Sequence, residues 1–215
     1  MEVELQYVYT GEGPLLVPVE LAHLVLARSE SFAIVDTYFD TEDLCLRRSG
    51  CSLRTRVADN QPSPRLTWKG PSRRSSDHNG KRRAETELPL DTLPETGRAM
   101  ASILRKHGLW DVIRGAAGLG REAALQPVGQ LRCRRSTHTY VHGLHRLELS
   151  WDRLAYPVGP AEIRLEVELR SAVAEDFLEQ ADRELRALFG AELLRPERGK
   201  VRELCERLYP ALVAA

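Results

Sequence analysis

Charged side chains alternate with apolar ones along several short segments of the chain. Val3 separates Glu2 from Glu4, and Arg54 and Arg56 repeat the same spacing further along. Because side chains two apart in a β-strand point to the same face, each segment is predicted to be a strand with one charged face and one apolar face. The pattern recurs at Thr67 and Lys69, at Arg83 with Glu85 and Glu87, and at Arg164 with Glu166 and Glu168. The chain is therefore predicted to fold largely as antiparallel strands that gather charges on one side.

A sheet with one face in water is the simpler interpretation, because antiparallel sheets often alternate apolar and polar residues in this way. Two observations favour a binding site instead. Glu, Lys and Asp are poor strand formers, whereas the Thr, Ser and Gln that usually occupy exposed strand faces are scarce in these segments. Acidic and basic segments also follow one another, and such charges packed together would destabilise the fold without a ligand. Carboxylates bind Mg²⁺ or Mn²⁺ while Arg and Lys bind phosphate oxygens, so the pattern predicts a site for a metal ion and a polyphosphate.

The length and charge of the chain limit the classes of protein to consider. Its 215 residues fit one domain, residues 1–215, and its 31 basic residues balance 31 acidic ones. A balanced charge gives no overall attraction to nucleic acid or to a membrane surface, so an anion site must be local. The four cysteines lack CxxC spacing and the six histidines lack HExxH or paired metal spacing, which argues against zinc sites and disulfides. Acidic residues near the N-terminus and the lack of a long apolar run predict a cytoplasmic protein.

The hydrophobic periodicity predicts about eight strands and three or four helices. Strands are expected near residues 2–9, 33–40, 51–58, 64–70, 83–90, 130–142, 145–152 and 161–170. Helices are expected near residues 18–28, 93–107, 173–189 and 199–208, with an exposed loop at 71–83 and a linker at 109–130. Eight strands can close into a barrel that holds one small ligand. We therefore predict an α+β fold, a closed eight-stranded antiparallel β-barrel with a charged interior and helices packed outside.

Several segments carry motifs of a known family. Glu2-Val3-Glu4-Leu5-Gln6 is similar to an ExExK signature, and VDTYFDTEDLCLRRSGCSLRTR resembles a Tyr-Asp-Thr turn followed by an Arg-x-Arg strand. Further segments resemble a strand with a lysine, an Arg-x-Glu strand, a basic strand, acidic strands and a C-terminal lysine segment: RLTWKGP, RRAETEL, RCRRSTHTY, LELSWDR, AEIRLEVELRS and PERGKVREL. In this order, through essentially the whole chain, the sequence resembles the CYTH proteins, also called triphosphate tunnel metalloenzymes. The resemblance is to the branch of bacterial inorganic triphosphatases and thiamine triphosphatases.

The resemblance implies a tunnel of eight antiparallel strands that binds a triphosphate and uses Mg²⁺ or Mn²⁺. On this basis the metal-side candidates are Glu2, Glu4, Glu85, Asp152, Glu162, Glu166 and Glu168. The phosphate-binding candidates are Arg54, Arg56, Lys69, Arg83, Arg134, Arg135 and Lys200. Which arginines of the basic strand face the site is left open, because Arg132 and Arg134 share one face and Arg135 takes the other.

Gln6 departs from the family signature, in which a lysine is associated with the phosphate end of the site and with activation of the attacking water. Glutamine cannot act as a base, although it can orient a water molecule or donate to a phosphate oxygen. Lys69 and Lys200 are therefore catalytic candidates together with Gln6, and a metal-activated water is the alternative.

Three functions remain open at this point. The favoured one is metal-dependent hydrolysis of a small triphosphate, inorganic tripolyphosphate or thiamine triphosphate, by attack of water on the terminal phosphoryl group. A class IV-type adenylate cyclase is the second, because the same family includes such enzymes, but the sequence displays no adenine pocket. The third is a polyphosphate- or nucleotide-binding module without turnover, which Gln6 favours. The expected partner is a small triphosphate, with no nucleic acid and no membrane, and the protein acts alone or as a homodimer.

Overall fold

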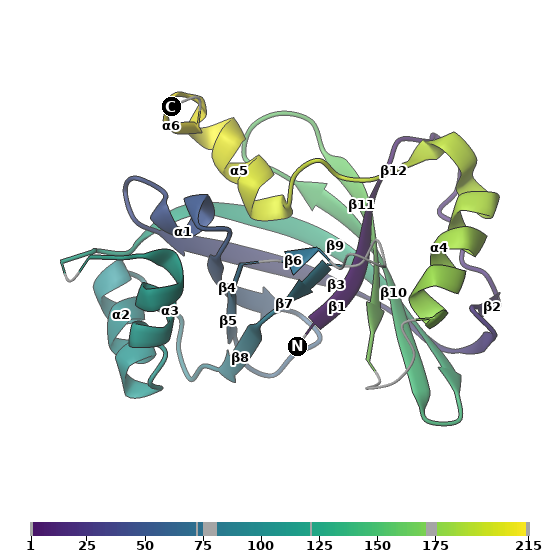
Figure 1. The fold of residues 1–215 in the computed structure, drawn as a ribbon, viewed down its shortest axis with the longest axis horizontal. Helices are drawn as coiled ribbons and strands as arrows, with labels where there is room; N and C mark the ends of the chain where they lie inside the picture. The colour runs from purple at the N-terminus through teal and green to yellow at the C-terminus, as the bar shows by residue number, and fades with distance from the viewer. Residues whose placement is uncertain (1, 72, 75–80, 121, 171–175, 214–215) are drawn as a thin grey trace.

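One antiparallel β-sheet forms the body of the protein (Figure 1). We describe it from a computed structural model that covers residues 2–71, 73–74, 81–120, 122–170 and 176–213. The strands are β1 (Glu2–Tyr9), β2 (Glu20–Leu21), β3 (Leu24–Asp40), β4 (Ser52–Ala58), β5 (Arg65–Lys69), β6 (Arg73–Arg74), β7 (Lys81–Arg83), β8 (Glu85–Pro89), β9 (Gln126–His142), β10 (His145–Ala155), β11 (Glu162–Leu169) and β12 (Leu193–Leu194). Neighbouring strands follow the order β6-β7-β1-β11-β10-β9-β3-β4-β5-β8, while β12 pairs with β1 and β2 pairs with β3.

Helices cover the apolar outer face of this sheet on two opposite sides (Figure 1). The described helices are α1 (Cys45–Arg48), α2 (Gly97–Lys106), α3 (Trp110–Ala117), α4 (Asp176–Phe189), a 3₁₀ turn (Gly190–Glu192), α5 (Lys200–Leu208) and α6 (Pro210–Val213). Leu185 of α4 belongs to one buried cluster with Trp151 of β10. Met100 of α2 and Ile113 of α3 belong to a second cluster with Leu53 of β4. The helices predicted near 93–107 and 173–189 therefore do pack against the outer face of the sheet.

The helix α5 packs on the inner face of the sheet instead. Its residues Leu204 and Cys205 form a buried cluster with Ile34 of β3 and Cys133 of β9. Asp36 stands two positions after Ile34 in β3, and Arg135 stands two positions after Cys133 in β9. These charged residues therefore share the face of their apolar neighbours. The inner face is therefore apolar where α5 covers it and charged beyond that point. Lys200, the first residue of α5, lies at this boundary.

The sheet does not close into the predicted eight-stranded barrel. Twelve strands take part among the described residues, and within that part of the chain no ladder of hydrogen bonds joins the two ends of their order. The strand β7, which stands next to β6 at one end of the order and pairs with β1, is nevertheless separated only by Ala84 from β8, the strand at the other end, which pairs with β5. The predicted antiparallel α+β fold is thus confirmed, whereas the closed barrel is not. The segment that contains β7 and β8 pairs first with β1 and then with β5. The alternation of charged and apolar residues carries no information about this change of partner.

The helix predicted near residues 18–28 is wrong. This stretch holds β2 and the start of β3, joined at Ala22 and His23, whose φ angles of 52° and 65° form a tight turn. Pairing with β9 starts at Val25 and continues, through two register shifts, to the end of β3. The apolar spacing that resembled a helix comes from the short strand β2 and the start of the long strand β3, on either side of a turn. Pairing with the long β9 therefore overrides the local pattern.

Two other expectations are also revised. The linker predicted at 109–130 contains α3, and β9 begins at Gln126. In the predicted loop at 71–83, β6 pairs with β7, while residues 72 and 75–80 lie outside the described part of the chain. Across the described residues, we find no helix with the length and apolar character that spanning a membrane requires.

Candidate functional site

A cavity of about 590 Å³ opens on the inner face of the sheet. Its charged lining residues are Arg47, Arg48, Arg54, Arg56, Lys69, Arg83, Arg135, Arg170, Lys200 and Arg202 on the basic side, and Glu85, Glu87, Glu166 and Glu168 on the acidic side. Ten cationic side chains thus face four carboxylates among the described lining residues. The excess of positive charge favours an anionic ligand.

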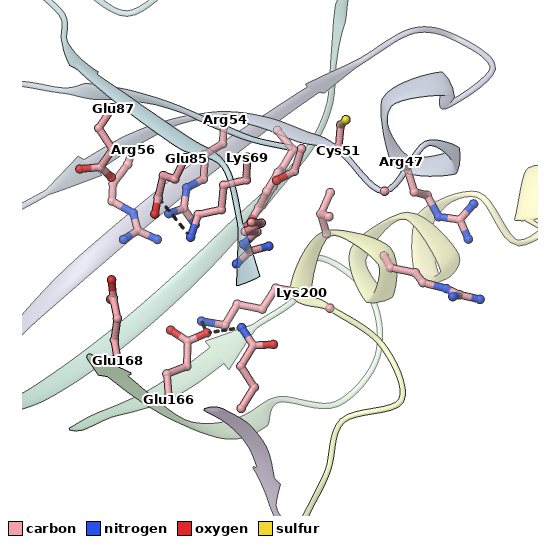
Figure 2. A pocket seen from close by; sticks show the side chains of 18 of the residues that line it. Arg47, Cys51, Arg54, Arg56, Lys69, Glu85, Glu87, Glu166, Glu168 and Lys200 are labelled. Carbon is pink, nitrogen blue, oxygen red and sulfur yellow. Dashed lines mark hydrogen bonds and ion pairs between the residues drawn. The ribbon is translucent and has the colours of Figure 1, made fainter. Parts of the chain in front are cut away.

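Arg54 and Arg56 of β4 and Lys69 of β5 form what we call the basic wall of the cavity (Figure 2). Asp36 of β3 holds both arginines from behind. Its carboxylate accepts from Arg56 Nε at 2.7 Å, from Arg56 Nη2 at 2.8 Å and from Arg54 Nη1 at 3.1 Å. Burial alone would raise the pKa of Asp36, but the two guanidiniums outweigh it and lower that pKa. Asp36 therefore stays ionised and fixes the direction of two cavity arginines.

Lys69 completes the basic wall through a contact with β8. Lys69 Nζ lies 3.1 Å from Glu85 Oε1, and Thr67 Oγ1 donates to Glu87 Oε1 at 3.2 Å. Figure 2 shows Lys69 and Glu85 beside Arg54, facing Glu166 and Lys200 on the other side. The register of β5 with β8 produces this contact, because Lys69 stands directly opposite Glu85.

Arg135, Asp152, Glu166 and Lys200 form the facing side, which we call the mixed wall. Arg135 of β9 donates from Nε and Nη2 to the carboxylate of Asp152, each at 2.6 Å, and from Nη2 to Glu166 Oε2 at 2.6 Å. Lys200 Nζ lies 2.8 Å from Glu166 Oε1 and also donates to Asp152. Asp152 is fully buried and binds both Arg135 and Lys200. Glu166, on the neighbouring strand β11, binds the same two cations.

Pairing of opposite charges sets the ionisation of the mixed wall. Burial opposes the charge of Glu166, but Lys200 and Arg135 hold its pKa well below the usual value. Burial likewise opposes the charge of Lys200, but Asp152 and Glu166 raise its pKa. Lys200 therefore carries its proton at neutral pH.

Gln6 of β1 bridges two carboxylates at the edge of the mixed wall. Its Nε2 donates to Glu4 Oε1 at 2.9 Å and to Glu166 Oε1 at 3.1 Å. Glu4 is buried, with 3% of its surface exposed, and also accepts from Arg83 Nη2 at 2.8 Å. A neutral amide thus occupies the space between two anionic groups. The arrangement leaves their charge less neutralised than a lysine at the same position would.

The structure brings most of the sequence-predicted residues to this cavity. Gln6, Arg54, Arg56, Lys69, Arg83, Glu85, Arg135, Glu166, Glu168 and Lys200 line it. Glu4 and Asp152 lie behind the lining and hold Arg83, Arg135 and Lys200.

Three candidates lie elsewhere or cannot be placed. Arg134 is exposed on the outer face, so Arg135 is the residue of the basic strand that points inward. Glu162 shares the face of Glu166 but is held by Arg164 Nε at 2.7 Å, outside the cavity lining. The side chain of Glu2 lies outside the described part of the chain.

Sequence reasoning missed Asp36 and the basic residues at one end of the cavity. Asp36 stands opposite Arg56 in the register of β3 with β4, so the alternation rule could have found it. Arg47 and Arg48 belong to the short helix α1, and Arg202 belongs to the first turn of α5. Strand alternation carries no information about helical residues, so these three residues gave no signal.

A comparison with known protein families identifies the family of this chain. The CYTH domain family matches residues 1–191, and the chain belongs to this family. Comparison with curated proteins returned no match.

Solved structures share the fold at low sequence identity. HpAC1 from Hippeastrum, for which a dominant triphosphatase activity is described, is 18% identical with a TM-score of 0.66, and the alignment covers 99% of each chain. The PH1819 protein from Pyrococcus horikoshii OT3 is 16% identical with a TM-score of 0.51, over 94% of this chain and 98% of that chain. An adenylate cyclase candidate from Bacillus halodurans is 18% identical with a TM-score of 0.51, over 80% of this chain and 82% of that chain. These likenesses establish the fold.

The resemblance to metalloenzymes raises the question of whether these residues suit a divalent cation. Within the described part of the chain, no three Asp, Glu, His or Cys side chains are grouped so as to hold a metal ion. Two carboxylates do meet, because Glu4 and Glu166 accept from the same nitrogen of Gln6. Mg²⁺ is commonly held by one or two carboxylates, with substrate phosphates and water as its other ligands. Glu4 and Glu166 offer oxygen donors of the type that such an ion takes, and Gln6, Arg83, Arg135 and Lys200 contact these carboxylates in this structure.

Proposed function

We propose that the protein is a metal-dependent hydrolase of a small triphosphate, inorganic tripolyphosphate or thiamine triphosphate. The observation that carries this proposal is the cavity itself, in which fixed guanidinium and ammonium groups outnumber carboxylates. Phosphoryl transfer asks little covalent chemistry of a protein and depends on positioning and on stabilising negative charge. The basic wall and the mixed wall supply both from opposite sides of one cavity.

The basic wall supports binding of the phosphate chain. Arg54 and Arg56 have 12% and 13% of their side-chain surfaces exposed, and Asp36 fixes their orientation. The Nε atom of Arg54 is buried and has no hydrogen-bond partner among the described residues. A buried donor without a partner destabilises the protein, so a phosphate oxygen at this position would be favourable.

Lys200 serves in this proposal as a phosphate ligand and not as a base. Its raised pKa keeps it protonated, so it cannot accept a proton from water at neutral pH. Gln6 cannot accept a proton either, but its amide fixes Glu4 and Glu166. When bound, Mg²⁺ or Mn²⁺ would neutralise charge on the phosphate oxygens and lower the pKa of a coordinated water. We propose Glu4 and Glu166 as the residues that hold this ion.

The reaction consumes one water molecule. Its oxygen bonds to the terminal phosphorus while the bond from that phosphorus to the bridging oxygen breaks. Tripolyphosphate would thus give orthophosphate and pyrophosphate, with release of a proton. In this proposal Arg135 and Lys200, which line the cavity, stabilise charge on the phosphate chain during this step.

The lining of the cavity favours hydrolysis over cyclisation. Tyr38 is the one aromatic side chain among its described lining residues, and only 3% of its surface is exposed. An adenine ring is commonly held by aromatic stacking or by an apolar pocket. A substrate that consists mainly of phosphate therefore suits this cavity better than ATP.

A product assay tests the proposal. The purified protein is incubated with tripolyphosphate, thiamine triphosphate or ATP in Mg²⁺ or Mn²⁺, and the products are identified. We expect orthophosphate, loss of activity in EDTA and recovery when metal is restored. Pyrophosphate with cyclic AMP would indicate a cyclase, binding without product would indicate a binding module, and full activity in excess chelator would refute the metal requirement.

Neighbouring arginines on β9 provide a matched pair of variants. Arg135→Gln removes a cavity cation, whereas Arg132→Gln changes an exposed arginine on the outer face of the same strand. We expect the first substitution to lower kcat/KM by about 10²-fold or more, as loss of a group that stabilises developing charge commonly does. Arg132→Gln should retain the parent rate. Circular dichroism of both variants distinguishes lost chemistry from lost folding.

A further inference from the structure

The cavity extends beyond its two walls to a rim between α1 and α5. We define the mouth as Arg47 and Arg48 of α1 together with Arg202 of α5, all of which line the cavity. Figure 2 shows Arg47 beyond Cys51, away from the group that contains Arg54, Lys69 and Lys200. The mouth therefore belongs to the same cavity but lies away from the space between the basic wall and the mixed wall, which we call the catalytic part of the cavity.

One carboxylate serves several guanidinium groups at the mouth. Glu206 Oε1 lies 3.1 Å from Arg47 Nη2 and 2.8 Å from Arg202 Nε, and Glu206 Oε2 lies 2.8 Å from Arg198 Nε. Glu206 is thus shared by three guanidinium groups, of which Arg198 also lies 3.9 Å from Glu203, while Arg48 pairs with the exposed Asp43. Because like charges repel, this cluster would be stabilised by an added anion.

Arg47 also carries an unsatisfied hydrogen-bond donor. Its side chain is only 10% exposed, and its Nε atom is buried without a hydrogen-bond partner among the described residues. A buried N–H group without an acceptor is unfavourable. The same condition holds at Arg54 in the basic wall, so unsatisfied guanidinium donors occur both at the centre and at the mouth of the cavity.

The start of α5 adds positive potential at the same place. Gly199, which also lines the cavity, is the N-cap of this nine-residue helix and supplies no side-chain acceptor for its first turn. The free N–H groups of a helix N-terminus attract anions. Here they lie in the same turn as Arg202, so the helix and the guanidinium cluster act together.

We propose that the mouth is a second anion subsite, which binds the distal phosphates of a linear polyphosphate longer than tripolyphosphate. This inference rests on the proposed function, because the terminal phosphates would occupy the catalytic part of the cavity. Guanidinium groups match repeated phosphate oxygens. The mouth offers no aromatic side chain against which a base or a thiazole ring could stack, since Tyr38 is the one aromatic residue among the described lining residues.

Substrate length is the variable that tests this proposal. KM and kcat are measured for tripolyphosphate and for tetrapolyphosphate with the parent protein and with R47Q/R202Q. The parent is expected to have a KM about tenfold lower for tetrapolyphosphate, as one or more additional charge-assisted hydrogen bonds would give. R47Q/R202Q should lose this preference, with little change in KM for tripolyphosphate and in kcat for either substrate. The control R132Q should keep the preference.

A second variant and a binding measurement keep the test decisive. R48Q/R202Q changes two side chains that are 54% and 57% exposed, so it preserves the fold if loss of the buried Arg47 does not. Calorimetric titration with both polyphosphates in EDTA compares affinities without relying on turnover. Tighter binding of tetrapolyphosphate without hydrolysis would support the subsite and refute the proposed hydrolase. Equal KM and equal affinity for the two lengths in the parent, or equal losses on both substrates in the variants, would overturn the subsite.

Discussion

Replacement of Asp36 by asparagine tests whether the basic wall depends on one buried carboxylate. Asp36 is 2% exposed and accepts three hydrogen bonds from Arg54 and Arg56. Asparagine keeps one acceptor oxygen but turns an NH₂ group toward guanidinium donors. Removal of one partner of a buried ion pair destabilises proteins by about 3–5 kcal/mol, because the other charge remains buried. Because asparagine retains one acceptor, we expect Asp36→Asn to lower the free energy of unfolding by about 3 kcal/mol, the lower end of that range.

Thermal unfolding followed by circular dichroism measures this loss. For a chain of this length, each kcal/mol lowers Tm by about 2–4 °C, so Asp36→Asn should lower Tm by about 6–12 °C. Asp111→Asn is the matched control, since Asp111 is 83% exposed and its contact with Arg114 is 3.3 Å long. An exposed pair of this kind contributes at most about 1 kcal/mol.

Ligand binding supplies the second half of the test. Tripolyphosphate at a hundredfold excess over Kd should stabilise the parent protein by about 2.7 kcal/mol. The Asp36→Asn protein should gain more in Tm, because phosphate oxygens then provide the negative charge that Arg54 and Arg56 have lost. A Tm within about a degree of the parent would refute the buried-pair argument. An equal or smaller gain from tripolyphosphate would show that these arginines do not hold phosphate.

Other perturbations probe the mixed wall. Gln6→Lys should change the pH dependence of hydrolysis while altering the rate only modestly, because the remaining cavity charges are in place; a gain of about 10²-fold or more from an almost inactive parent would contradict this and favour a binding module. Lys200→Met removes the cation shared by Asp152 and Glu166 and should raise the KM for tripolyphosphate by about tenfold or more; an unchanged KM in steady-state assays would remove Lys200 from the phosphate site. The folded-state pKa values of Asp36, Asp152 and Glu166 are lowered, so their contribution to stability is present at neutral pH and is lost as the pH falls below about 4. Urea unfolding between neutral and acidic pH should show this loss, and a pH-independent unfolding free energy would contradict it.

The alternation of charged and apolar residues predicted the inner face well where strands are long and regular. Arg54 and Arg56 share one face, as do Glu166 and Glu168, and all four line the cavity. Alternation alone could not place Glu162, which shares that face but lies where Arg164 fills the interior next to α5. Which face points inward is local information, whereas position along the cavity depends on the stagger between strands.

Residues outside regular strands were harder to predict. The apolar spacing near 18–28 satisfies a helix as well as two short strands, and only pairing with β9 decides between them. Arg47 reaches the cavity from α1. Asp40 fixes the start of this helix, because its carboxylate accepts from the backbone N–H groups of Leu46 and Arg47. Such contacts depend on tertiary packing, which a single sequence does not encode as a periodic signal.

The bridge from Gln6 to Glu166 has a consequence for how the protein folds. The two residues are 160 positions apart, yet they stand on adjacent strands and share a hydrogen bond at the edge of the mixed wall. Among the described strands, β1 pairs with β7, β11 and β12, which all follow much later in the chain, and closing such long loops slows folding. A chain interrupted before β11 would contain the basic wall but lack Glu166 and Lys200. The cavity therefore cannot be complete before β11 and α5 have joined β1, and an anion that contacts both walls would stabilise this contact between distant segments of the chain.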